Sequence, residues 1–274
     1  MKRVVLFIMV LLLAVQCFAQ ISSQQKNLIV ADTLVDDAKF RKFSFEFESA
    51  EFSKKVYFLL PLIEDDAVRQ LIWDNMIGRQ YDSKTLEQKL QEEINMYMDR
   101  VADNPELINA EKMDERYSDV EYYESSWYVT PKFVSKEYIA LADYFSEFNG
   151  GAIHHQWGEV VYVFSLSTGK QISEDDVFDN IDAHRYLVAS KLYELLQKNL
   201  GYDSDELFVD NVMQMLNGNF YFTEDELIYM YEPYEVACYA AGEPLVSLSK
   251  KWLKPYLNAE GPLYKYWFGD KKTK

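Results

Sequence analysis

Two adjacent histidines are the residues of this sequence whose type most directly suggests chemistry. His154 and His155 are two of only three histidines, and neutral imidazole is the commonest protein ligand for a metal ion. In a strand, however, neighbouring side chains point to opposite faces, so this pair cannot chelate a metal from one side without a bend. No CxxC, HExxH or HxH motif accompanies the pair. We therefore expect structural histidines, with no metal and no other cofactor.

Motifs for nucleophilic or nucleotide chemistry are absent from the sequence. There is no GxSxG motif, no motif that would pair Cys238 with a histidine, and no glycine-rich nucleotide-binding loop. Two suitably placed carboxylates are enough for a glycosidase, but a chain with 45 acidic residues meets that requirement by chance. We therefore assign no catalytic residue.

Two segments offer side chains that could contact a ligand. Glu232 and Glu235 flank Pro233-Tyr234, and such carboxylates either bind a cation or sugar or belong to a solvated turn. Aromatic residues likewise form either contact surfaces or the core. The paired glycines near the histidines allow a tight turn there. The candidate ligand-binding residues are Gly150, Gly151, His154, His155, Tyr231, Glu232, Tyr234 and Glu235.

The N-terminus predicts that the protein is exported. Lys2 and Arg3 precede an unbroken apolar run over residues 4–15, and Cys17-Phe18-Ala19 resembles a small-residue cleavage site. This pattern is typical of a secretory signal peptide over residues 1–19, removed after Ala19. The alternatives are a lipoprotein anchored through Cys17 and a retained signal anchor. We expect a periplasmic or extracellular protein without a transmembrane segment after cleavage.

The net charge narrows the class of partner. Cleavage removes two basic residues and no acidic one, so the formal charge changes from −17 to −19. Such acidity argues against nucleic acid, whose phosphates require clustered lysine and arginine. It also argues against an anionic membrane surface. A basic protein partner would be attracted over long distances.

Hydrophobic periodicity predicts an α+β protein. Phe43, Phe45 and Phe47 alternate with polar residues, which indicates a strand with one buried face. Runs of strands are followed by runs of helices, twice over. The expected strands are residues 56–63, 125–134, 138–148, 160–166, 220–222, 227–231 and 236–240. The expected helices include segments beginning near residues 65, 83, 173, 204 and 249, and a helix through residues 188–196. Ser173 is the expected N-terminal cap of one helix, and Gly201 the expected C-terminal cap of another.

Two sequence blocks resemble a known extracellular family. GGAIHHQWGEVVYVFSLSTGKQISEDDVF is similar to a "GGAH" turn, a strand, a "TGK" turn and an acidic "DDLF" helix start, except that Ile153 interrupts the first turn. NFYFTEDELIYMYEPYEVACYAAGEPLVSLSKKWLKPYL is similar to a closing segment whose strand ends in "PYE". Together they resemble the extracellular region of RsiV, the lysozyme-sensing anti-sigma factor, and the non-catalytic domains of PdaC-type peptidoglycan deacetylases.

The resemblance implies two adjacent α+β domains, each with a mainly antiparallel sheet packed by helices. We expect a linker or arm over residues 20–38, a deacetylase-associated domain over 39–158 and an RsiV-like domain over 159–274. The enzymatic domain of the deacetylases has no counterpart here. The resulting hypothesis is a cell-envelope binding protein without catalysis, which recognises a lysozyme-like protein or a peptidoglycan fragment. The alternative is a cell-wall sugar hydrolase or deacetylase that uses carboxylates or a histidine-bound metal.

Overall fold

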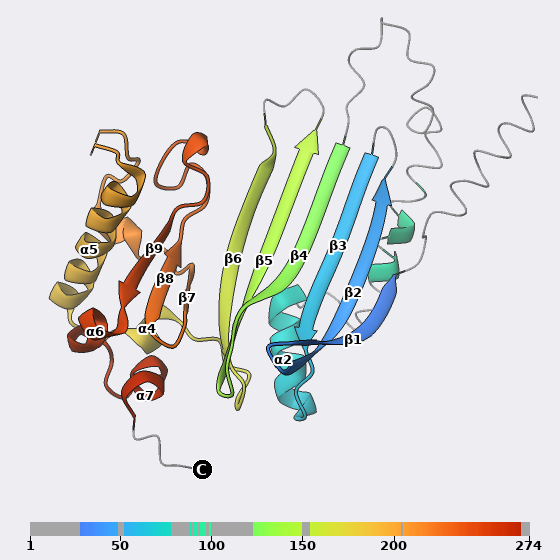
Figure 1. Cartoon of the computed structure of the whole chain (residues 1–274), viewed down its shortest axis with the longest axis horizontal. Helices are drawn as coiled ribbons and strands as arrows, with labels where there is room; N and C mark the ends of the chain where they lie inside the picture. Colours follow the sequence, from blue (N-terminus) through green and yellow to red (C-terminus); the bar gives the residue numbers. More distant parts are fainter. Residues whose placement is uncertain are drawn as a thin grey trace, which may run out of the picture.

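A computed structural model describes residues 28–48, 52–77, 123–149, 154–203 and 205–269, together with single positions between 88 and 99. It contains a six-stranded sheet, a three-stranded sheet and several helices, which confirms the predicted α+β class (Figure 1). The expected signal peptide, Cys17 and the glycine pair Gly150-Gly151 lie outside the described residues.

The six strands of the larger sheet lie side by side in chain order. All neighbours are antiparallel except β3 and β4, which are parallel. A parallel pair needs a crossover connection, and helix α2 (Asp66–Ile77) lies in the segment that supplies it. The strands are β1 (Ile29–Val35), β2 (Ala38–Glu48), β3 (Phe52–Pro61), β4 (Tyr123–Val134), β5 (Tyr138–Asn149) and β6 (Gln156–Ser165). The arm expected over residues 20–38 therefore includes β1.

One face of the large sheet is covered by α2. Phe43, Phe45 and Phe47 of β2 are buried on this face, as their alternation predicts. Val68, Ile72 and Met76 of α2 pack against them. In the helix expected from residue 83, Leu90 and Ile94 are helical and join the same core, and the rest of that helix lies largely outside the described residues.

The second half of the chain packs on the opposite face, at β5 and β6. Figure 1 places strands β7–β9 between α5 and β6. The core there joins Ala140, Ala142, Val161 and Val163 of the large sheet to α5 and the small sheet. The elements are α4 (Glu174–Val177), α5 (Asp182–Leu200), η4 (Val212–Met215), β7 (Phe220–Phe222), β8 (Glu226–Met230), η5 (Tyr239–Ala241), β9 (Leu245–Ser249), α6 (Lys250–Leu253), η6 (Lys254–Tyr256) and α7 (Pro262–Phe268).

Strand β5 serves both cores. Ile139 and Leu141 point into the core beneath α2, whereas Ala140 and Ala142 point into the second core. The predicted domain boundary between residues 158 and 159 falls inside β6, which is hydrogen-bonded to β5 along its length. At this point the two cores therefore lie on opposite faces of one sheet.

Two predicted caps are confirmed, and two predicted elements are wrong. Asp176 accepts hydrogen bonds from the backbone and hydroxyl of Ser173 at the start of α4, and Gly201 ends α5 with a φ of 67°. The helix expected from residue 204 is a series of turns that ends in the short 3₁₀ helix η4. The strand expected over residues 236–240 is a bend followed by η5, and β9 takes its place beside β8.

Candidate functional site

The structure brings together two segments that the sequence singles out separately. His154 lies just before β6, and Tyr234 lies in the loop after β8. The Nε2 atom of His154 is 3.2 Å from the hydroxyl of Tyr234. The imidazole also stacks on the ring of Tyr239, with centroids 3.8 Å apart. These contacts fix the loop after β8 against the start of β6.

The partners of His154 determine how its protons are arranged. Its Nδ1 atom is 2.9 Å from the carbonyl oxygen of His155, which only accepts hydrogen bonds, so Nδ1 carries a proton. In the neutral imidazole, Nε2 is then an acceptor and the hydroxyl of Tyr234 donates to it. Both nitrogens of His154 are engaged within the protein.

A second chain of hydrogen bonds supports this arrangement. The indole of Trp157 donates to the hydroxyl of Tyr239, and that hydroxyl donates to the carbonyl oxygen of His155. His155 itself stacks on Phe148, and its Nδ1 atom lies 3.3 Å from the hydroxyl of Ser146. The two imidazole rings therefore have different partners, although Tyr239 contacts both residues.

Tyr234 has a strained backbone and an exposed side chain. Its φ is 68°, in the left-handed region that is costly for a residue with a Cβ atom. More than half of the residue is exposed, so core packing does not explain this conformation. Strain of this kind tends to persist at functional positions, where the surroundings hold it in place.

Aromatic side chains continue from this point across the face of the large sheet on which the second half of the chain packs. The ring centroids of Tyr144 in β5 and Trp157 in β6 are 6.2 Å apart. Tyr128 of β4 stacks on Tyr144, with ring centroids 5.6 Å apart. Tyr57 of β3 is the partner of Tyr128 in the strand register. We call this set the aromatic band, and it consists of Tyr57, Tyr128, Tyr144, Trp157, Tyr239, His154 and Tyr234.

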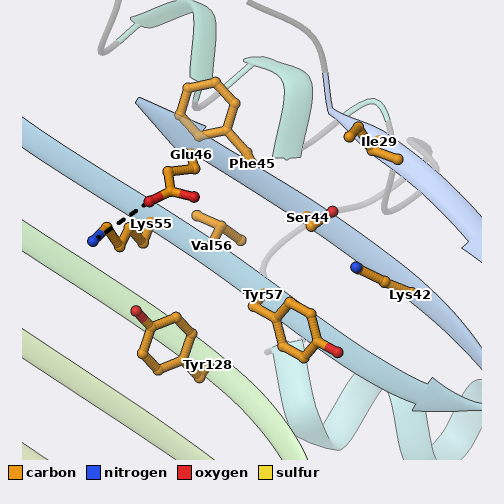
Figure 2. Close-up of a pocket in the computed structure, with 9 residues that line it drawn as sticks. All are labelled: Ile29, Lys42, Ser44, Phe45, Glu46, Lys55, Val56, Tyr57 and Tyr128. Atoms are coloured by element: carbon orange, nitrogen blue, oxygen red, sulfur yellow. Dashed lines mark ion pairs between the residues drawn. The ribbon is translucent and has the colours of Figure 1, made fainter. Parts of the chain in front are cut away.

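The far end of the aromatic band borders a hollow of about 370 Å³. Figure 2 shows Tyr57 and Tyr128 side by side on neighbouring strands. The ion pair between Glu46 and Lys55 lies beside them, with 3.5 Å between Oε1 of Glu46 and Nζ of Lys55. The ammonium of Lys42 lies 5.1 Å from the centre of the Tyr57 ring. The hollow therefore combines aromatic faces with charged and hydroxyl groups.

Carboxylates line the other end of the aromatic band. Glu159 of β6 is buried and accepts a hydrogen bond from Lys132 at 2.6 Å. The carboxylate of Glu232 occupies the space beside Gly158, where an added Cβ atom would lie 2.6 Å from its Oε1. Glu243 lies near both Glu159 and Lys132, and its Oε1 atom is buried without a hydrogen-bond partner among the described residues.

Burial changes the acidity of two of these carboxylates. For Glu243, burial and the nearby Glu159 carboxylate raise the pKa to about 7, although Lys132 opposes the shift. For Glu232, burial is again the main cause, followed by the charge of Glu235, and the pKa is raised. Near neutral pH the cluster thus holds a carboxyl group that is partly protonated beside one that is paired with an ammonium.

The remaining predicted site residues have structural contacts. Tyr231 is completely buried and donates to the carbonyl oxygen of Met215, so it belongs to the core rather than to this surface. Glu235 accepts hydrogen bonds from the backbone of Glu232 and the amide of Asn217, which holds the turn. Among the described residues, no group of three or more His, Cys, Asp or Glu side chains is placed to hold a metal ion.

The sequence interpretation missed the tyrosines of the sheet and the carboxylates around Lys132. Tyr128 and Tyr144 lie in predicted strands, where alternation alone could have placed each on one face. Their stacking depends on the β4–β5 register, which pairs them directly. Register across strands is a long-range property that a single sequence does not reveal.

Part of the chain matches a family model. Residues 175–251 match the family described as "Protein of unknown function (DUF3298)". This segment runs from α4 to α6 and includes Glu232 and Tyr234 of the site. No curated protein matches the sequence.

Two crystal structures share the fold. One is a member of the DUF3298 family from Bacteroides fragilis NCTC 9343, with 15% sequence identity, a TM-score of 0.60, and coverage of 84% of this chain and 94% of that one. The other is a DUF3298 family protein from Pseudomonas aeruginosa PAO1, with 10% identity, a TM-score of 0.56, and coverage of 81% and 95%. The similarity extends over both sheets, well beyond residues 175–251. None of the helices described here has the length and apolarity that a membrane crossing requires.

Proposed function

We propose that this protein is an exported envelope protein that binds a glycan along the aromatic band and performs no chemistry on it. The observation that carries the proposal is the row of Tyr57, Tyr128 and Tyr144 across three neighbouring strands. All three are half-buried and lie on the face of the sheet on which the second half of the chain packs at β5 and β6. Aromatic faces pack against the C–H faces of sugar rings, and their hydroxyl groups remain available as hydrogen-bond partners.

The surroundings of the band suit such a ligand. Sugar hydroxyls need acceptors as well as donors, and Glu46 and Lys55 supply both at the hollow. Glu159, Glu232 and Glu243 supply acceptors at the other end. A peptidoglycan fragment is the glycan that the predicted export and the resemblance to the RsiV and PdaC families favour. That resemblance and the exported location remain predictions.

Calorimetric titration with soluble peptidoglycan fragments tests the proposal. We expect Tyr128→Ala and Tyr144→Ala each to weaken binding by about five- to thirtyfold, which corresponds to the loss of an aromatic contact of about 1–2 kcal/mol. Tyr186→Ala is the matched control, because Tyr186 is an exposed tyrosine on α5. Equal losses in all three variants, or the absence of binding by the unaltered protein, would refute the proposal.

The same titration separates the glycan from the predicted protein partner. The acidity of the chain suits a basic, lysozyme-like protein through long-range attraction. Such binding should weaken steeply as salt is added, because exposed charges are screened over about 10 Å at 0.1 M ionic strength. Salt-sensitive binding of lysozyme, together with no response to glycan, would replace the glycan by a protein ligand.

One observation supports the alternative of a cell-wall sugar hydrolase. Two carboxyl groups whose environments differ are the usual basis of acid and base roles in glycosidases. Glu243, whose pKa is raised to about 7, lies near Glu159, which is paired with Lys132. Release of reducing ends from peptidoglycan, abolished by Glu243→Gln, would establish hydrolysis. Unchanged peptidoglycan after prolonged incubation would leave binding alone.

A further inference from the structure

A cluster of lysines lies at the other end of the molecule, around α6 and α7. Figure 1 places these helices away from β1–β3. A second hollow there, of about 470 Å³, is lined by Asp225, Ser249, Lys250, Lys251, Lys254 and Phe268. Three lysines thus line one hollow in a chain whose net charge is −17.

The charges of these lysines are not neutralised within the described part of the chain. Lys250 and Lys254 lie over the ring of Phe268, at 5.5 and 4.6 Å from its centre. Lys250 also donates to the carbonyl oxygen of Glu224 at 3.4 Å. No described carboxylate forms an ion pair with any of the three, although Asp225 lines the same hollow. By contrast, Lys132, Lys170, Lys191 and Lys265 each have a carboxylate partner.

The local structure holds the lysines together at some cost. Ser249 caps the start of α6, and the backbone of Lys250 donates to the carbonyl oxygen of Asp225. Lys250 and Lys254 are four residues apart along the helical turn that runs from α6 into η6, so they lie on one face. Like charges at this spacing destabilise a helix. An anion between them would convert the repulsion into attraction.

We propose that this hollow binds a ligand through a phosphate group. A phosphate has several anionic oxygens and is readily bound by ammonium groups acting as point charges. The volume exceeds what a lone phosphate needs and falls within the range of small-molecule sites, so the phosphate belongs to a larger molecule. The ring of Phe268 supplies an apolar wall for the rest of that molecule. The proposal is independent of the glycan site, because it uses none of the same residues.

Calorimetric titration with glycerol 3-phosphate tests the chemistry, with glycerol as the uncharged control. We expect the unaltered protein to bind only the phosphate compound. The triple variant Lys250→Gln, Lys251→Gln, Lys254→Gln should lose at least about tenfold in affinity, as expected when charge-assisted hydrogen bonds are removed. The matched control neutralises Lys39, Lys136 and Lys198, which are exposed lysines elsewhere, and should bind as the unaltered protein does.

Phosphatidylcholine vesicles with and without phosphatidylglycerol distinguish the source of the phosphate. Binding to the anionic vesicles, lost in the hollow variant, indicates a lipid headgroup, whereas binding of glycerol 3-phosphate alone indicates a soluble ligand. The single variant Lys251→Gln provides the same comparison if the triple variant is unstable. Equal losses in the hollow and control variants, or no binding to either probe, would overturn the proposal. Neither result would bear on glycan binding by the aromatic band.

Discussion

The imidazole of His154 lies 3.2 Å from the hydroxyl of Tyr234, although the two residues are 80 positions apart in the chain. The contact joins the start of β6 to the loop after β8, and stacking of His154 on Tyr239 reinforces it. It places one end of the aromatic band at the junction between the two halves of the protein. Substitutions around this junction test the structure directly.

Replacing Tyr234 should reveal the cost of its backbone conformation. Tyr234→Gly removes the penalty for a positive φ, and we expect it to be more stable than Tyr234→Ala by about 0.5–1 kcal/mol. Both variants lose the contact with His154, so the difference isolates the backbone. Urea denaturation of the two variants measures it. Equal midpoints would show that the conformation at residue 234 carries no strain.

A side chain at residue 158 should displace Glu232. The Cβ atom of Gly158→Ala would lie 2.6 Å from the carboxylate of Glu232 and 2.9 Å from the ring of Phe145. Both groups are the ends of side chains, so they move apart at a cost of about 1 kcal/mol. We expect Glu232→Ala to recover part of that loss in the double variant. A double-mutant cycle measures the coupling between the two positions from the unfolding free energies. A coupling energy of zero would contradict the contact.

Asn219 should be essential for joining the two halves. Its side-chain amide accepts a hydrogen bond from the backbone N–H of Val161 and donates one to the carbonyl oxygen of Glu159, each at 2.8 Å. It thus pairs with two backbone groups at the edge of β6 that a neighbouring strand would otherwise pair with. Because the site is buried, Asn219→Ala leaves two backbone groups unpaired and should cost about 2–4 kcal/mol. Asn199→Ala is the control, since the amide of Asn199 is exposed and donates one 3.3 Å hydrogen bond. Equal melting temperatures of the two variants in thermal unfolding would exclude this role.

Glu243 should make the protein less stable as the pH rises. Its pKa is raised from 4.5 in the unfolded chain to about 7 in the folded one, so the folded state binds the extra proton between these values. Ionisation in the folded protein is therefore unfavourable, and stability falls as the pH rises through that window. Since the residue is only half-buried, solvent screening reduces the effect to about 1 kcal/mol.

Glu243→Gln should remove this part of the pH dependence. We expect the variant to gain stability relative to the unaltered protein at about pH 8 and to gain none at about pH 4, where both forms are neutral. Glu137→Gln, at an exposed position in the turn between β4 and β5, is the control. Parallel stability curves for Glu243→Gln and the unaltered protein across this range would contradict the raised pKa.

Local patterns in the sequence are sufficient for many individual elements. The alternation of Phe43, Phe45 and Phe47 predicts both the strand and its buried face, because the strand period is fixed by backbone geometry. Ser173 and Gly201 mark helix ends correctly, because capping depends on residues within one turn. The α+β class follows from such elements taken together.

Tertiary packing overrides local preference elsewhere. Residues 236–240 have the apolar and aromatic character of a strand, yet β9 occupies the position beside β8. Val236 and Ala237 are buried in the second core without strand pairing, and η5 follows them. Apolar character predicts that these residues are buried, but it does not determine which backbone hydrogen bonds they form.

The sequence by itself determined the fold class, most strands, the caps and the two segments that meet at His154 and Tyr234. Only the tertiary structure decided that they meet, because that contact depends on packing across 80 residues. It also placed Tyr128 and Tyr144 in one stacked row and brought Asp225 and Phe268 beside the lysines of α6 and η6. Periodicity depends on neighbours along the chain, whereas a binding surface depends on register and packing between distant segments.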